Sequence, residues 1–304
     1  MTLRGRLLLV SPDGMLGRAW KALAEAQAIE HETVLYPEFD LTDRAHVKRA
    51  ITEGHSWVVN CSAFTDVDGA EKKEPEAFLV NAAGVGYLAE RCLEVGATLV
   101  HYSTDYVFDG SATVPYPVNA PYDPINAYGR SKAEGERLIV ASGAPHLTVR
   151  TSWLYAPWAN NFVRTMARMS LERAELRVVN DQRGRPTSAE QLASATLGLL
   201  ERSAAARGAD GIFHVTDGGE CTWFEFAQRI VRATNPQCRV VPCATAEFPR
   251  PARRPSYSVL DLSKVERVLG PRPPWQQCVD DVLGRLEPLR HTAPPAPLPG
   301  GTGR

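Results

Sequence analysis

The sequence lacks long apolar runs, blocks of like charge and a cysteine framework, and each absence excludes a class of protein. No run of eighteen apolar residues is present, so no membrane-spanning helix is predicted. The 34 basic and 35 acidic residues leave a net charge of −1, and the densest basic stretch, 250–254, is diluted by proline. Nothing in this charge pattern points to nucleic acid or a membrane surface as a partner.

The cysteines and the N-terminal segment predict a cytoplasmic protein. The six cysteines form no CxxC pair and no regular spacing. The apolar run at residues 7–10 is too short for a signal peptide and leads directly into a glycine-containing loop. We therefore expect reduced cysteines and the cytoplasm as the compartment.

What is present is a regular alternation of strand and helix patterns over the first half of the chain. Apolar runs typical of buried strands occur at residues 7–10, 33–36, 57–60, 98–103 and 146–150. Helical patterns lie between them, at residues 18–27, 42–53 and 74–95 and in the segment after Asn126. This order predicts an α/β fold, a doubly wound, Rossmann-like parallel sheet built from right-handed βαβ units.

The second half of the chain is less regular. Helices are predicted at 161–172, 189–207, 222–234 and 275–286, strands at 176–179 and 211–215, and a proline-punctuated loop at 242–255. We expect residues 1–150 to form a dinucleotide-binding domain, joined by parts of 176–207, and residues 151–290 an interleaved, smaller mixed substrate-binding domain. The tail, residues 291–304, holds four prolines and three glycines and is expected to be disordered.

Tyr128 and Lys132 stand four residues apart in a predicted helix, which places both side chains on one face, about 6 Å apart. A phenol with a pKa near 10 is a poor acid at neutral pH, and a nearby ammonium favours the phenolate and lowers that pKa. The pair could then exchange a proton with an alcohol or sugar oxygen. The alternative is a helix surface that carries two unrelated side chains.

The loop after the first strand has part of a dinucleotide-binding fingerprint. Gly14 and Gly17 stand three residues apart before a helix, but Ser11 occupies the position where the first glycine is expected. Backbone N–H groups at a helix start attract phosphate, and glycines allow the backbone to approach it closely. Strand–turn–helix joints without a ligand also contain glycine. The position of this loop after the first strand of an α/β chain is what favours dinucleotide binding.

Cofactor choice stays open. The second strand ends without an acidic residue until Glu38, whereas NAD-binding proteins usually place an acid there for the adenosine ribose. Arg18 could meet the 2′-phosphate of NADP, or it could be a solvated helix residue. We expect NADPH, with NADH as the alternative.

Thr104 and Asp105 follow the fourth strand, where ligands bind in doubly wound sheets. A hydroxyl there can donate a hydrogen bond to a reacting carbonyl oxygen. An ordinary capped strand end is the alternative, and the Tyr128–Lys132 pair downstream favours the catalytic interpretation.

Three longer motifs carry a family resemblance. These are HYSTDYVFDG at 101–110, NAYGRSK at 126–132 and RTSWLY at 150–155, followed by matches at 160–162, 180–187 and 254–255. Together they resemble the extended short-chain dehydrogenase/reductases, and more closely the dTDP-4-dehydrorhamnose reductase family, over residues 5–286. Matches at so many separated motifs are far more specific than any single one.

The resemblance implies a role for each matching residue. The catalytic residues would be Thr104, Tyr128 and Lys132. Residues near the cofactor would be Gly14, Met15, Leu16 and Gly17 at the pyrophosphate, Asp40 and Leu41 by the adenine, Ala63 by the ribose, and Lys132 by the nicotinamide ribose. Ser11 and Arg18, in and just after the same loop, are predicted to bind the cofactor from their positions. The sugar would meet Asp105, Tyr106 and Trp153, and the nucleotide diphosphate Asn161, Arg183 and Arg254. Interdomain packing is the alternative for Trp153, and solvated surface charge for Arg183 and Arg254.

The implied activity is NAD(P)H-dependent reduction of the 4-keto group of a nucleotide-linked 6-deoxy sugar, with dTDP-4-dehydro-L-rhamnose as the expected substrate. A sister reductase for another nucleotide deoxysugar is an alternative. So is a non-catalytic, dinucleotide-binding regulatory subunit similar to that of methionine adenosyltransferase, although the intact catalytic trio argues against it. A homodimer is left open.

The sequence departs from the family pattern at two places. Ser11 replaces a glycine and could crowd the turn. Some family members bind magnesium through glutamates at a dimer interface, but here only Glu190 lies in a matching motif. The other expected positions fall on Ala19 and about Arg285, so no metal is predicted.

Overall fold

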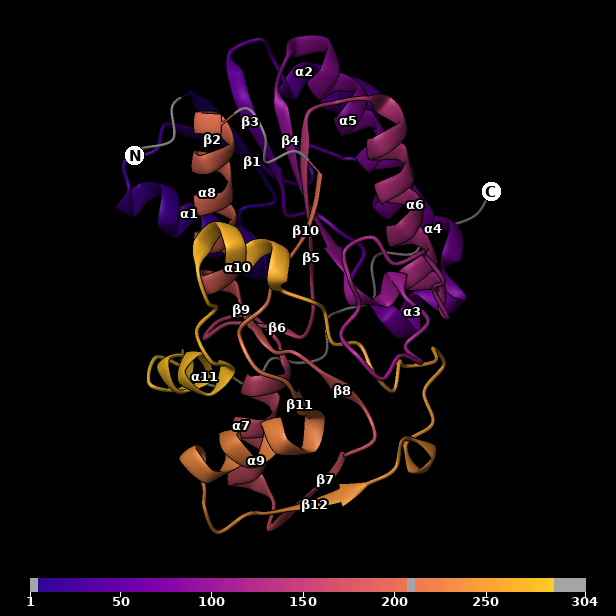
Figure 1. Ribbon diagram of the computed structural model, residues 1–304, viewed down its shortest axis with the longest axis vertical. Coiled ribbons are helices and arrows are strands. Elements are labelled where there is room, and N and C mark those ends of the chain that lie inside the picture. Colours follow the sequence, from indigo (N-terminus) through magenta and orange to yellow (C-terminus); the bar gives the residue numbers. More distant parts are fainter. Residues whose placement is uncertain (1–4, 207–210, 287–304) are drawn as a thin grey trace.

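A computed structural model describes residues 5–206 and 211–286 of the chain. The tail expected to be disordered, 291–304, lies outside the described residues. Two lobes are visible in Figure 1, with a parallel sheet and its helices above and a smaller group of helices and short strands below.

The upper lobe is built on six parallel strands in the order β10-β5-β4-β3-β1-β2. The strands are β1 (Arg6–Val10), β2 (His31–Val34), β3 (His55–Asn60), β4 (Thr98–Thr104), β5 (His146–Thr151) and β10 (Gly211–His214). The chain runs outward from β1 in both directions, so the predicted doubly wound, Rossmann-like sheet is confirmed.

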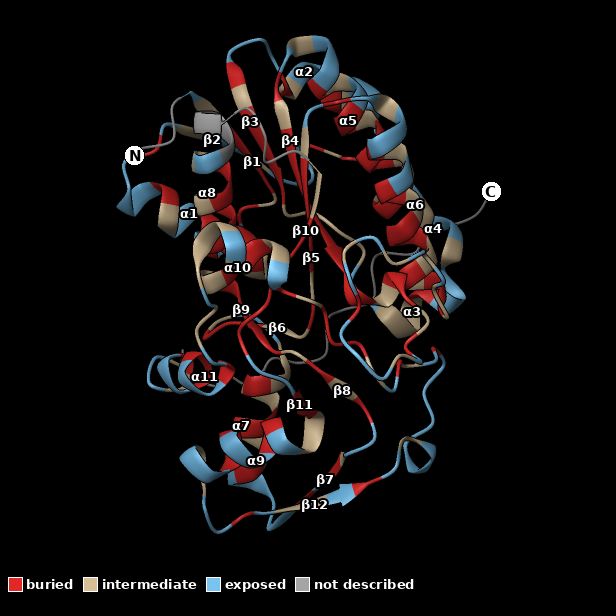
Figure 2. Cartoon of the chain, viewed as in Figure 1, coloured by how far each residue is buried: buried red, intermediate tan, exposed pale blue. Residues whose placement is uncertain are grey.

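Alternate side chains of each strand supply two separate cores. On one face, Leu7 and Leu9 pack with α1 (Met15–Ala26), α8 (Ala189–Ala206) and α10 (Ser263–Leu269). On the other, Leu8 and Val10 pack with three further helices of this lobe. These helices are α2 (Arg44–Ala50), α5 (Gly84–Val95) and α6 (Ala127–Ser142). Because both faces of the sheet are covered, the central strands β1, β3, β4 and β5 are buried over most of their length, as Figure 2 shows.

The smaller lobe has its own apolar core, built around Phe226 and Trp275. Its helices are α7 (Phe162–Glu172), α9 (Trp223–Thr234) and α11 (Trp275–Leu283). Its strand pairs are β7 (Glu175–Val179) with β12 (Arg239–Cys243) and β8 (Arg183–Gly184) with β11 (Cys221–Thr222), while β6 (Leu154–Tyr155) pairs with β9 (Thr187–Ser188) where the lobes meet.

Several elements differ from the sequence prediction. The helix expected over 74–95 is divided into α4 (Glu74–Phe78), a π-helical turn (Leu79–Ala83) and α5, which ends at the left-handed Gly96. In that turn the Asn81 side chain bonds the backbone of Phe64 in both directions, at 2.9 and 3.0 Å. A tertiary contact thus accompanies the interruption of a continuous helical pattern.

Other short elements carried too little signal to be predicted. Helices α3 (Val67–Lys72) and α10 were not predicted. Strand β12 extends into the region 242–255, which was predicted as loop because of its prolines, beginning with Pro242. The 3₁₀ turn Thr245–Glu247 follows the strand. Proline is tolerated there because β12 pairs on one side only, with β7.

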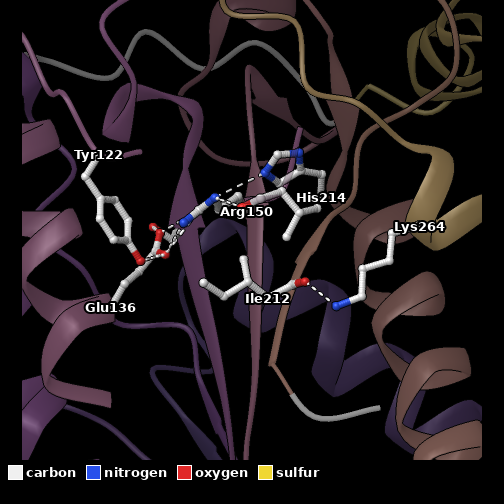
Figure 3. Close-up of polar contacts among 8 residues, drawn as sticks. Tyr122, Glu136, Arg150, Ile212, His214 and Lys264 are labelled. Carbon is white, nitrogen blue, oxygen red and sulfur yellow. Dashed lines mark hydrogen bonds and ion pairs between the residues drawn. The ribbon is translucent and has the colours of Figure 1, made fainter. Parts of the chain in front are cut away.

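A buried polar network ties α6 to the sheet beneath it (Figure 3). The Arg150 guanidinium donates to both oxygens of Glu136, at 2.7 to 3.1 Å, and neither side chain is more than 1% exposed. Tyr122 donates to Glu136 at 2.9 Å, and the imidazole of His214 lies 3.4 Å from Arg150. Removing one partner of such a pair would leave the other charge buried and uncompensated, which is strongly destabilising. The pair therefore fixes α6 against β5 and β10.

All six cysteines are unpaired, as expected, and five of them are buried. Within residues 5–206 and 211–286, no helix combines the length and apolar character needed to cross a bilayer.

Candidate active site

Tyr128 lies in the first turn of α6, directly beside the carboxyl end of β4. Asn126 caps this helix by accepting a hydrogen bond from the Gly129 N–H at 2.8 Å. A Cβ on Gly129 would lie 2.1 Å from the carbonyl oxygen of Tyr106, so only glycine allows this close approach. The rings of Tyr106 and Tyr128 consequently meet edge to face, with 5.9 Å between their centroids.

The phenol of Tyr128 is held in its protonated form. Burial raises its pKa to about 12, the charge of Asp105 acts in the same direction, and a hydrogen bond with Thr104 opposes them. The sequence-based expectation that Lys132 lowers this pKa is wrong for this arrangement. Spacing along the helix placed the two residues on one face, but it could not show where the lysine nitrogen points.

Lys132 points at strand β4. Its Nζ donates to the Tyr102 carbonyl at 2.6 Å and lies 3.2 Å from Nε2 of His101. Burial lowers the pKa of Lys132 to about 8, while the Glu136 carboxylate one helical turn away raises it. The amine therefore titrates close to neutral pH.

Thr104 and Asp105 stand where β4 ends, as predicted, and both are buried. The Thr104 hydroxyl donates to Asp105 Oδ1 at 3.0 Å and accepts from the Tyr106 N–H at 3.2 Å. Burial raises the pKa of Asp105 to about 6, against hydrogen bonds from Ser258 and Thr104 that lower it. Burial also raises the pKa of Tyr106.

The loop before α1 has the geometry of a phosphate cradle. Ser11 takes the left-handed conformation, φ 59°, and its N–H donates to the Val34 carbonyl at 2.8 Å. A Cβ on Gly17 would lie 2.0 Å from the Ser11 carbonyl oxygen, so no larger residue fits there. Helix α1 starts at Met15 and extends through Leu16, and Gly14 before it carries no side-chain cap that would occupy the first N–H groups.

Arg18 and the loop are tied to the segment that follows β5. The indole of Trp158 donates to the Met15 carbonyl at 3.0 Å, and the Arg18 guanidinium lies over the same ring, 4.8 Å from its centroid. Trp158 was missed in the sequence, because no local pattern indicates that it returns to the first loop of the chain.

The remaining predicted cofactor residues lie on the loops after β2 and β3. Asp40 Oδ1 accepts from the N–H and the hydroxyl of Thr42, at 2.8 and 2.7 Å, and Leu41 is buried against Gly84. Ala63 is half-buried in a loop held by Asn60 and Asn81. Contacts of these residues with a dinucleotide stay a prediction.

A cleft of about 710 Å³ opens between the smaller lobe and the Tyr106 turn. Of the predicted substrate residues, Tyr106 and Arg254 line it. Lining residues to which no role was assigned from the sequence are Phe162, Arg177, Gln182, Trp223, Arg250 and Arg253. They come from four separate segments, and only the folded lobe brings them together.

The other predicted substrate residues have structural partners. Trp153, at φ 48°, stacks on Trp223 with 3.6 Å between ring centroids, and so backs a wall of the cleft. Asn161 caps α7 by accepting from the Arg164 N–H at 3.2 Å. Arg183 lies 3.5 and 3.7 Å from the carboxylates of Glu220 and Glu225. Asn161 and Arg183 are not among the residues lining the cleft.

Arg254 and its neighbours close one side of the cleft. Asp68 accepts from Arg254 at 3.1 Å and from Arg250 at 3.4 Å. These two contacts fasten the arginine-rich loop to α3, which lies in the upper lobe. The loop thereby lines the cleft, and its Arg253 carbonyl accepts a hydrogen bond from Asn126 at the start of α6.

Glu190, the residue in a family metal-binding motif, forms a bidentate ion pair. The Arg285 guanidinium donates to its two carboxylate oxygens at 2.8 and 2.6 Å. Among the residues that the structure describes, no group of three or more His, Cys, Asp or Glu side chains is arranged to hold a metal ion.

Comparison with known proteins supports one family. Residues 5–287 match the model of the RmlD substrate binding domain. A dTDP-4-dehydrorhamnose reductase of Sinorhizobium fredii is 40% identical over 280 residues, 90% of this chain and 94% of that protein. The Bacillus subtilis spore coat polysaccharide biosynthesis protein SpsK is 35% identical over 282 residues, 91% and 96%.

A solved structure agrees with the sequence relatives. The dTDP-4-dehydrorhamnose reductase of Bacillus anthracis, crystallised in complex with NADP, is 34% identical, superposes with a TM-score of 0.86 and covers 92% of this chain and 98% of its own. The family model and these relatives show that the chain belongs to the dTDP-4-dehydrorhamnose reductase family.

Proposed function

We propose that this protein reduces the 4-keto group of dTDP-4-dehydro-L-rhamnose with NADPH and forms dTDP-L-rhamnose. The observation that carries the proposal is the position of Tyr128, a protonated phenol next to Thr104 at the carboxyl end of β4. The loop before α1 and the cleft beside Tyr106 support the two binding sites that such a reaction needs.

The loop from Ser11 to Gly17 fits a dinucleotide pyrophosphate. Gly17 allows the loop to pack closely on α1, no side-chain cap occupies the first N–H groups of that helix, and the helix dipole favours negative charge there. Arg18, Asp40, Leu41 and Ala63 would lie along the adenosine half, and Lys132 by the nicotinamide ribose. When bound, the reduced dinucleotide supplies the hydride.

The protein's own contribution is the proton and the orientation of the carbonyl. Tyr128 donates its proton to the carbonyl oxygen as that oxygen gains negative charge. A pKa of about 12 keeps this phenol protonated at neutral pH, as an acid requires. The Thr104 hydroxyl, in contact with both Tyr128 and Asp105, would orient the same oxygen.

The cleft would bind the nucleotide part of the substrate. Arg250, Arg253 and Arg254 place positive charge beside it, where a diphosphate would sit. The Trp153–Trp223 stack and Phe162 give it aromatic walls. We assign cofactor binding to the upper lobe and substrate binding mainly to the smaller one, with Asp105 and Tyr106 reaching the sugar from above. Asn161 and Arg183 would act on the substrate indirectly, through α7 and β8.

NADPH is the proposed reductant because the Bacillus anthracis relative was crystallised with NADP. A sister reductase of another nucleotide deoxysugar is the second candidate, since SpsK is named for spore coat polysaccharide biosynthesis and is about as similar as several reductases. Cytoplasmic location and a homodimer stay predictions.

A turnover panel tests the proposal. The purified protein is mixed with dTDP-, UDP- and GDP-linked 4-keto-6-deoxy sugars, each with NADPH or NADH, and loss of reduced nicotinamide is recorded. We expect the highest kcat/KM with dTDP-4-dehydro-L-rhamnose and NADPH. A clear preference for another sugar would favour the sister reductase, and no turnover with any pair would refute the reductase function.

A further inference from the structure

We infer that His101 is a positioning residue for Lys132. A chain of hydrogen bonds runs from the Ser62 N–H through the side chains of Asn60 and His101 to the Lys132 amine. Asn60 and His101 are direct partners across β3 and β4. They are 1% and 0% exposed, and Lys132 is 2% exposed. The inference rests on the role proposed above for Lys132, but the arrangement itself does not depend on any substrate.

The direction of the chain is set at its first member. The backbone N–H of Ser62 can only donate, and it reaches Asn60 Oδ1 at 3.0 Å. This contact fixes the amide so that its Nδ2 faces His101 Nδ1, at 3.2 Å. Since an amide nitrogen donates, Nδ1 must accept. The neutral imidazole therefore carries its hydrogen on Nε2, the atom that lies 3.2 Å from Lys132 Nζ.

This direction has a consequence for the lysine. A neutral amine has a lone pair that can accept the Nε2–H, whereas an ammonium has donors only and would face another donor. The Tyr102 carbonyl, at 2.6 Å from Nζ, can accept from either form. The chain is therefore complete when Lys132 is neutral, and one contact is lost when Lys132 gains its charge.

The electrostatic surroundings act in the same direction. Burial lowers the pKa of Lys132 to about 8, with Glu136 opposing it. Burial, Lys132 and His146 all hold the pKa of His101 well below its usual range, so the imidazole stays neutral. His101 and Asn60 thus keep Nζ on the β4 side of α6 and set the pH at which it becomes charged.

The tautomer of His101 is a direct test that needs no substrate. Long-range ¹H–¹⁵N correlation spectra of the full chain should show neutral His101 with its hydrogen on Nε2. In Asn60→Asp, a near-isosteric change, the carboxylate can only accept. It can then accept from both Ser62 and His101, and the imidazole should switch to the Nδ1–H form. A wild-type spectrum with the hydrogen on Nδ1 would overturn the inference.

A pH profile of kcat tests the effect on Lys132. In Asn60→Asp, Nε2 becomes an acceptor that favours the ammonium, so the limb assigned to Lys132 should move to higher pH by about one unit. His101→Gln, which keeps a donor near the Nε2 position, should leave that limb close to the wild type. His55→Gln is the matched control, because His55 is a buried histidine of β3 bonded to Thr52 and Glu32.

If Asn60→Asp folds and the limb of its kcat–pH profile assigned to Lys132 does not shift, Asn60 and His101 only pack in the core and do not tune Lys132. His55→Gln should change only the melting temperature. If no nucleotide sugar is turned over, the proposed function fails while the tautomer assignment still stands or falls on the NMR spectrum.

Discussion

The side chain of Asn126 joins the first turn of α6 to the backbone of Arg253. Its Oδ1 accepts from the Gly129 N–H at 2.8 Å, and its Nδ2 donates to the Arg253 carbonyl at 2.9 Å. One amide therefore fixes both the helix that carries Tyr128 and the loop that lines the cleft.

Asn126→Asp separates these two contacts. Aspartate caps a helix about as well as asparagine, so the melting temperature should change little. The variant cannot donate to Arg253, and we expect KM for the nucleotide sugar to rise several-fold. Asn126→Ala, which loses both contacts, should also lower stability by about 1 kcal/mol. An unchanged KM in Asn126→Asp would show that the loop is held by its other contacts.

Tyr128→Phe removes the proton donor and keeps the ring that packs on Tyr106. Folding should survive, and turnover should fall by roughly 10²–10⁴-fold. The comparison is made by steady-state kinetics, with circular dichroism to verify the fold. Near-wild-type activity in the phenylalanine variant would remove Tyr128 from the mechanism.

Ser11→Gly tests the departure from the glycine fingerprint. Ser11 has φ 59°, a left-handed conformation that costs a non-glycine residue about 1–2 kcal/mol. Glycine should relieve this strain, raise the melting temperature and tighten NADPH binding, with little change in kcat. Ser11→Ala keeps the strain and serves as the control. Equal or weaker affinity of the glycine variant by calorimetry would show that the turn already accommodates serine.

Asp105→Asn should lower activity and raise stability, and the gain in stability should depend on pH. The pKa of Asp105 is raised to about 6 by burial, above the ordinary value of 3.8, so the folded state favours the protonated acid. Its ionisation therefore lowers stability progressively as pH rises from about 4 through 6. Asparagine, which is never charged, should be more stable than the wild type at pH 8 and nearly equal to it at pH 4.

Thermal unfolding of both proteins across this pH range measures the Asp105 effect. We also expect a lower kcat/KM in the variant, because Asp105 orders Thr104 and is proposed to face the sugar. A stability difference that does not depend on pH would mean that folding leaves the pKa of Asp105 unshifted.

The arrangement of the sheet was predictable because each βαβ unit leaves a local pattern. The buried strands read as apolar runs, Thr222 caps α9 in a capping box with Glu225, and Gly96 ends α5 in the left-handed conformation. These signals lie within a few residues of the feature they specify, so the fold class follows from the sequence.

The site was predictable only as far as its motifs reach. The motifs located Thr104 and Tyr128, but they could not show that Lys132 turns toward His101, since that contact spans 31 positions. Trp158 meets Met15 across 143 positions, and Arg177, Arg250 and Arg253 meet only because the smaller lobe folds around the cleft. Long-range packing, which has no local signature, decides these relationships.

The proposed reaction transfers a hydride to the 4-keto carbon, with Tyr128 as the acid. The most direct measurement uses NADPH labelled with deuterium at the transferable position and dTDP-4-dehydro-L-rhamnose, with mass spectrometry and NMR of the product. We predict dTDP-L-rhamnose with one deuterium on the former carbonyl carbon, and almost none formed by Tyr128→Phe in the same time. Product without deuterium at that carbon, or equal labelling by the phenylalanine variant, would contradict this mechanism.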